Sequence, residues 1–144
     1  MTFKEYIEAN NIKKDVETIY CSGSSLTDLN GIEMFTNLKY LNCGHNRLTQ
    51  LPNLDKLVNL THLYCNNNKL SELPNLDKLV NLKVLHCSHN ALTELPNLNK
   101  LVNLKYLNCN NNKLPKSFNG LSTEEVKSLA RQINRNKKID ELVN

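Results

Sequence analysis

The amino-acid sequence predicts an α/β solenoid, a stack of short coils that share one parallel β-sheet and carry a helix at each end. Two observations lead to this fold class. A 22-residue pattern recurs five times over residues 16–121, and self-similarity at such a period is typical of solenoids. Within each copy, apolar residues first alternate with polar ones and then recur at every third position. This change of spacing indicates one short strand and one turn-rich return segment per coil.

Residues 1–15 are expected to form an N-terminal helical cap. Thr2 and Glu5 have the spacing of a capping box, in which each side chain bonds the backbone amide of the other residue. The apolar residues Phe3, Tyr6 and Ile7 follow at helical spacing. The pattern therefore predicts a short helix that covers the first coil.

The first half of each copy predicts a strand. In THLYCNNNKL, residues 61–70, Leu63 and Cys65 point to one side, while His62, Tyr64 and Asn66 point to the other. Strands from successive copies are expected to pair in parallel. Because strands lie only about 4.8 Å apart, we expect the sheet to line the concave side of a curved stack.

The second half of each copy predicts the convex return segment. Leucines recur there at every third residue, a spacing that suits turns or 3₁₀ helix rather than a strand; in one copy they are Leu70, Leu73, Leu76 and Leu79. Pro74 lies in the same segment and cannot donate a hydrogen bond to a sheet.

Residues 122–144 are expected to form the C-terminal cap and tail. Ser122 and Glu125 make a second capping box. An apolar stripe at helical spacing follows, formed by Val126, Leu129, Ala130 and Ile133. We expect this stripe to cover the last coil and the polar segment 133–144 to fray, with a further turn of packing by Ile139, Leu142 and Val143 as the alternative.

The five copies, at residues 16–121, resemble the leucine-rich repeat family. The family signature LxxLxLxxNxL is present with cysteine in place of the third leucine, as in LTHLYCNNNKL. This resemblance implies a right-handed superhelix with a parallel concave sheet. The repeat length resembles the short class of phosphatase-regulating and internalin-type proteins, and the LxxLxCxxN variant is similar to repeats of giant amoeba viruses. Family membership names no partner, because one fold serves many.

The composition and the absence of long apolar runs indicate where this protein is expected to be located. The chain has a net charge of +4, with 40% hydrophobic and 22% charged residues. We find no apolar run of the length that a membrane span needs and no signal peptide. We therefore expect a cytoplasmic, monomeric protein without membrane attachment, located in the host cytoplasm if the source is viral.

The five cysteines are expected to be structural. Cys21, Cys43, Cys65, Cys87 and Cys109 are each 22 residues apart, so they form an inward-facing ladder with one thiol per coil. Metal sites usually bring two ligands within a few residues, and His86 and Cys87 point to opposite faces, which excludes a catalytic dyad. With no P-loop and no G-x-S-x-G motif, we expect neither an enzyme nor a cofactor or metal site.

A second ladder is formed by asparagines. Asn46, Asn68, Asn90 and Asn112, with Ser24 in the first copy, occupy the asparagine position of the repeat. An inward asparagine after a strand can bond backbone groups that the bend leaves unpaired. We therefore interpret this ladder as structural.

The outward strand positions are the candidate binding site. The three outward positions of each coil are Thr18, Tyr20 and Ser22; Tyr40, Asn42 and Gly44; His62, Tyr64 and Asn66; Val84, His86 and Ser88; and Tyr106, Asn108 and Asn110. None of these 15 residues is charged, whereas the 22% charged residues of the chain would place about three charges there. Tyrosine, histidine and asparagine are typical of adaptable recognition surfaces. The predicted contacts with a protein partner are Tyr20, Tyr40, Asn42, His62, Tyr64, Asn66, His86, Tyr106 and Asn108.

Four other interpretations remain open. The polar and aromatic residues are also compatible with a solvated sheet, because aromatic residues favour strands, and with a structural repeat protein that has no specific client. Lysines and arginines beside the strands and in the tail suggest nucleic acid or an acidic partner instead. A metal bound between His62 and His86 is a weaker hypothesis, because no carboxylate lies nearby.

Overall fold

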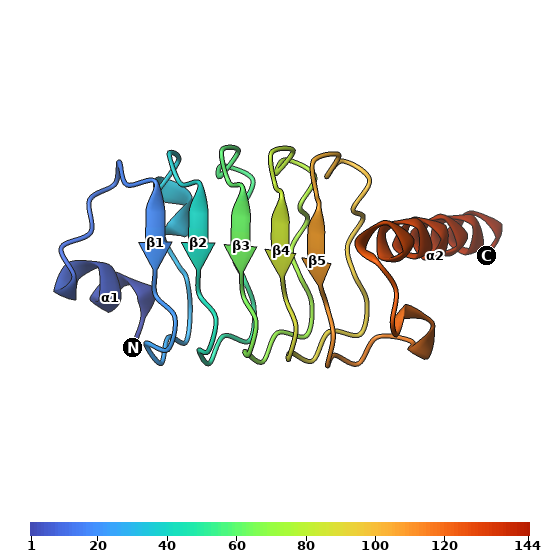
Figure 1. The fold of residues 1–144 in the computed structure, drawn as a ribbon, viewed down its shortest axis with the longest axis horizontal. Coiled ribbons are helices and arrows are strands. Elements are labelled where there is room, and N and C mark those ends of the chain that lie inside the picture. The colour runs from blue at the N-terminus through green and yellow to red at the C-terminus, as the bar shows by residue number, and fades with distance from the viewer.

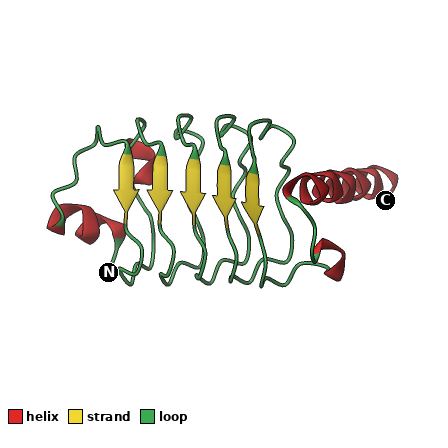
Figure 2. Cartoon of the chain, viewed as in Figure 1, coloured by secondary structure: helices red, strands yellow, loops and turns green.

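The computed structural model describes residues 1–144 as a five-stranded parallel sheet with a helix at each end (Figures 1 and 2). The strands are β1 (Thr18–Tyr20), β2 (Tyr40–Asn42), β3 (His62–Tyr64), β4 (Val84–His86) and β5 (Tyr106–Asn108). They lie in sequence order, and each residue pairs with the residue 22 positions later. The predicted fold class is confirmed.

The core runs through the middle of every coil. Inward residues of the strands and the leucines of the return segments are buried together in one cluster. The convex segments turn through hydrogen bonds between residues three apart, as from Leu57 N to Leu54 O and from Leu60 N to Leu57 O. Helical 3₁₀ turns occur only in the first and last return segments, at Ile32–Met34 and Lys116–Phe118.

The N-terminal helix α1 (Phe3–Ala9) seals the first coil. Thr2 and Glu5 form the predicted capping box. Phe3 is fully buried and packs edge-on against Phe35, with ring centroids 5.9 Å apart. The Tyr6 hydroxyl donates to the carbonyl of Tyr20, the last residue of β1. The helix thus provides both apolar cover and a hydrogen-bond donor to the first strand.

The C-terminal helix α2 (Thr123–Val143) seals the other end. Ser122 and Glu125 form the second predicted capping box, and Val126 and Ala130 are buried. The Thr123 hydroxyl accepts a hydrogen bond from the backbone amide of Leu107 in β5. No helix of the chain combines the length and the apolar character that crossing a bilayer requires.

The expected fraying after Ile133 is wrong. Helix α2 continues to Val143 and extends away from the stack (Figure 1). Ile139, Leu142 and Val143 add no packing, because they are 48%, 80% and 78% exposed. Residues such as Lys, Glu and Leu favour helix, and this local preference is enough to continue the helix beyond its contacts.

Candidate binding surface

The outward side chains of the five strands form one continuous row of rings. Tyr40 contacts Tyr20 and Tyr64 on the neighbouring strands, with ring centroids 4.8 and 5.3 Å apart. Tyr64 packs edge-on against His86 at 6.0 Å, and His86 packs in the same way against Tyr106 at 6.3 Å. Diagonal neighbours on a sheet are within reach of aromatic side chains, so the row crosses all five strands.

His62 joins this row from the adjacent position on β3. Its ring stacks on Tyr40 at 5.5 Å and on Tyr64 at 6.5 Å. The hydroxyl of Thr61 bonds its Nδ1 at 2.9 Å. Three rings therefore hold one another in the middle of the sheet, which limits the rotamers that each can adopt.

Exposure varies along the row. Tyr20 is 63% exposed and Tyr106 is 47% exposed at the two ends, while Tyr40, Tyr64 and His86 are half-buried. Burial is the main cause of a raised pKa for Tyr40, and the neighbouring Tyr64 and Tyr20 contribute. Burial also lowers the pKa of His86, with smaller contributions from His89 and His45.

The three predicted asparagines flank the rings but differ in their availability. Asn42 and Asn108 each accept a hydrogen bond from the backbone amide two residues later. Asn108 also donates to the Tyr106 hydroxyl at 3.4 Å. The Asn66 amide lies 3.5 Å from Nε2 of His45. Each asparagine keeps some unused hydrogen-bonding capacity.

The predicted outward orientation of the third position in each coil is partly wrong. Ser88 is only 3% exposed, and Gly44 is also buried. The hydroxyl of Ser88 bonds Nε2 of His86 at 2.8 Å, so it supports a ring instead of facing solvent. A Cβ on Gly44 would lie 2.9 Å from Oδ1 of Asn66. The coil bends directly after each strand, so the alternation of the strand does not continue through this row.

Two histidines beyond the strands belong to a feature that sequence reasoning did not resolve. His45, Asn67, His89 and Asn111 occupy one repeat position, each with a left-handed φ between 52° and 54°. Nε2 of His89 contacts the Asn111 amide at 3.0 Å, and Nε2 of His45 contacts the Asn67 amide at 3.4 Å. Asparagine tolerates this conformation well, and its recurrence at this position was the available signal.

The cysteine ladder lies behind the rings and inside the core. All five thiols are free and buried. Burial raises the pKa of each thiol, that of Cys21 to about 12. Cys21 and Cys43 donate their S–H groups to carbonyls of the next strand at 3.3 Å. The predicted inward ladder is confirmed.

The asparagine ladder joins each coil to the coil before it. Asn68 donates to the carbonyls of Cys65 and Cys43 at 3.1 and 3.0 Å, and its Oδ1 accepts from the amide of Leu48 at 3.0 Å. The same bonds recur at Asn46, Asn90 and Asn112. The ladder stabilises the bend that follows each strand.

Solved structures with this architecture come from several bacteria. The functional domain of InlJ from Listeria monocytogenes, described as including a cysteine ladder, is 39% identical with a TM-score of 0.64, covering 68% of this chain and 21% of its own. The protein LIC12759 from Leptospira interrogans is 34% identical with a TM-score of 0.61, covering 71% and 26%. The effector YopM from Yersinia pestis is 32% identical with a TM-score of 0.53, covering 69% and 24%.

This chain spans only about a fifth to a quarter of the length of those proteins. None of the three bears on the resemblance to viral repeats, which stays a prediction. A comparison with curated proteins found no match. The family model for leucine-rich repeats in two copies matches four overlapping segments, residues 14–56, 36–78, 58–95 and 80–123. This chain therefore belongs to the leucine-rich repeat family.

Proposed function

We propose that the chain is a non-enzymatic module that binds a protein partner on its concave sheet. The observation that carries the proposal is the continuous row of contacting rings, from Tyr20 to Tyr106, on a surface without charged side chains. Solenoids of this kind commonly use their concave surface for binding. Aromatic residues are enriched where interfaces concentrate their binding energy.

The mutual packing of the rings supports this use. Tyr40, Tyr64 and His62 already restrict one another before a partner arrives. A partner therefore immobilises few additional rotamers, which lowers the entropic cost of association. The ring faces and hydroxyl groups supply apolar area and hydrogen bonds together, while asparagines at the edge supply polar contacts.

The experiment is an affinity capture followed by mass spectrometry and a binary titration of the captured protein. The test variant is Tyr64→Ala/His86→Ala, which removes the centre of the row. The matched control is Val80→Ala/Val102→Ala, two exposed truncations on the convex side. We expect the concave variant to lose at least tenfold in affinity and the convex variant to bind like the natural chain.

Equal affinity of the concave variant and the natural chain would refute the proposed surface. A loss shared with the convex variant would indicate a partner that contacts another face. Circular dichroism and urea unfolding of both variants separate loss of a contact from loss of the fold.

A second candidate function is nucleic-acid or acidic-partner binding through the rim of the sheet. Lys83, Lys105, Lys69 and Lys113 are exposed beside the strands, and none has a carboxylate within ion-pair distance. Such binding would weaken steeply with added salt, because it depends on the release of counterions from phosphates. Titration of a single-stranded RNA at two salt concentrations tests it.

A further inference from the structure

A polar cleft lies at the C-terminal end of the solenoid, between α2 and the return segment near residue 98. Its volume is about 370 Å³, and its lining contains no hydrophobic residue. The lining consists of Asn97, Asn99, Arg131, Asn134, Arg135 and Lys138. The cleft therefore combines three cations with three amide side chains and has no carboxylate.

The three cations lie along one face of α2. Arg131, Arg135 and Lys138 are spaced i, i+4 and i+7, which places them on one side of a helix. The other two lysines next to them on α2, Lys127 and Lys137, are neutralised by ion pairs with Glu124 and Glu94. No such carboxylate pairs with any of the three cleft cations.

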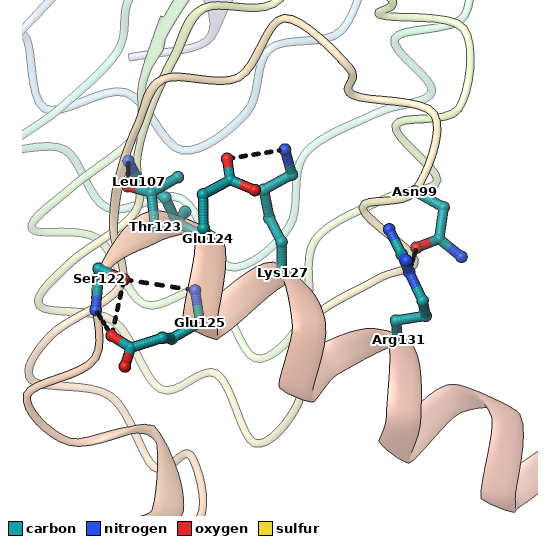
Figure 3. A network of polar contacts seen from close by, with 8 residues as sticks. All are labelled: Asn99, Leu107, Ser122, Thr123, Glu124, Glu125, Lys127 and Arg131. Atoms are coloured by element: carbon teal, nitrogen blue, oxygen red, sulfur yellow. Dashed lines mark hydrogen bonds and ion pairs between the residues drawn. The ribbon is translucent and has the colours of Figure 1, made fainter.

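Asn99 orients Arg131 without neutralising it. The guanidinium Nε donates to Oδ1 of Asn99 at 2.6 Å (Figure 3). This bond fixes the plane of the guanidinium group, while its two terminal amino groups make no hydrogen bond to the protein. A guanidinium held in this way is prepared to bind two oxygens of an anion side by side.

Two other coils carry aspartate at the repeat position of Asn99. Asp55 and Asp77 precede Asn99 at intervals of 22 residues. The backbone amide of each of these three residues donates the same turn bond to Oδ1 of the asparagine two residues earlier, at 2.7, 2.8 and 2.9 Å. The turn therefore accommodates aspartate. An aspartate at 99 would form an ion pair with Arg131, and the asparagine keeps the cleft cationic.

Asn134 contributes the third amide side chain of the cleft. It lines the same cleft, and its Nδ2 is buried without a hydrogen-bond partner. Buried amide donors are nearly always paired in folded proteins. Because this nitrogen is closed off from solvent, it reaches an anion in the cleft only when the Asn134 side chain turns toward it.

We propose that this cleft binds a small ligand that carries two or more linked phosphate groups. Guanidinium groups match phosphate oxygens in geometry and charge. The cations span seven residues of helix, or about 10 Å at 1.5 Å per residue, which is longer than one phosphate group. The volume is that of a small-ligand site. The site is separate from the concave surface, so failure of one proposal leaves the other unaffected.

The test is isothermal titration calorimetry of the full chain with inorganic tripolyphosphate and, separately, with inorganic phosphate at physiological ionic strength. We expect saturable binding of tripolyphosphate at one site per chain and at least tenfold weaker binding of phosphate. Arg131→Ala/Arg135→Ala should lose at least tenfold in affinity. Asn99→Asp should lose about as much, because it neutralises Arg131 while preserving the turn.

The matched control is Lys4→Ala/Lys14→Ala, which removes two exposed charges at the opposite end. We expect its affinity to stay within twofold of the natural chain. Absence of saturable tripolyphosphate binding would overturn the proposal, as would equal losses in the control or an unchanged affinity of Asn99→Asp. Equal affinity for phosphate would overturn the assignment to linked phosphates. Tighter binding of single-stranded RNA that the same variants abolish would assign the cleft to nucleic acid instead.

Discussion

Replacing Asn68 by alanine tests the role of the asparagine ladder. The side chain makes three short hydrogen bonds, two to carbonyls and one from an amide, all between 3.0 and 3.1 Å. Each buried backbone group that loses its partner costs about 1 kcal/mol or more. The loss of three bonds therefore predicts a decrease of about 3 kcal/mol in the free energy of unfolding.

Urea unfolding followed by circular dichroism measures this decrease. The matched control is Asn66→Ala, two residues away, because the Asn66 side chain makes only a 3.5 Å contact with His45. Substitutions of this kind usually change stability by less than about 0.5 kcal/mol. If Asn68→Ala loses no more than Asn66→Ala, the ladder does not stabilise the coils in the way described.

Four further outcomes follow from the same contacts. Cys65→Ala should lower the free energy of unfolding by about 1 kcal/mol, as a small core truncation, and should leave partner affinity unchanged, which titration of the folded variant checks. The native thiols should react with a thiol reagent only as fast as the chain opens, because burial holds their pKa high; rapid reaction of all five would contradict the buried ladder. Burial raises the pKa of Cys21 from the ordinary value of 9.0 to about 12. The contribution of this thiol to stability is therefore fully present below about pH 9 and is lost as the pH rises from there to about 12. Thermal melts at pH 8 and pH 10 should show a lower midpoint at pH 10. Thr123→Val should lower the free energy of unfolding by about 1 kcal/mol, as measured by urea unfolding, because it removes the acceptor for the Leu107 amide in the last strand. An unchanged free energy of unfolding would mean that water replaces the hydroxyl without cost.

Local patterns were sufficient to predict the fold. The alternation around Leu63 and Cys65 and the repeat period determined the strands and their register, since each strand can bury only one face. The two capping boxes at Thr2 and Ser122 predicted where both helices begin. These features depend on neighbours in the sequence or on copies of the same residue one coil away.

Features that combine distant or irregular segments were not predictable in this way. The cleft joins Asn99 to Arg131, which are 32 residues apart and belong to different kinds of element. The burial of Ser88 depends on how sharply the coil bends after β4, and the strand pattern carries no information about that bend. The contacts among Tyr40, His62 and Tyr64 require side-chain rotamers as well as register.

The direction of the asparagine bonds also has a consequence for how such a protein can change in length. Each asparagine bonds its own coil and the coil before it, so the first coil has no earlier neighbour to join and carries Ser24 at this position. The asparagine bonds are the same at every internal junction. Excision or duplication of one 22-residue period, such as residues 60–81, would leave each junction bond with an equivalent partner. The concave surface can therefore shorten or lengthen by one coil in a single genetic event, while both caps stay as they are.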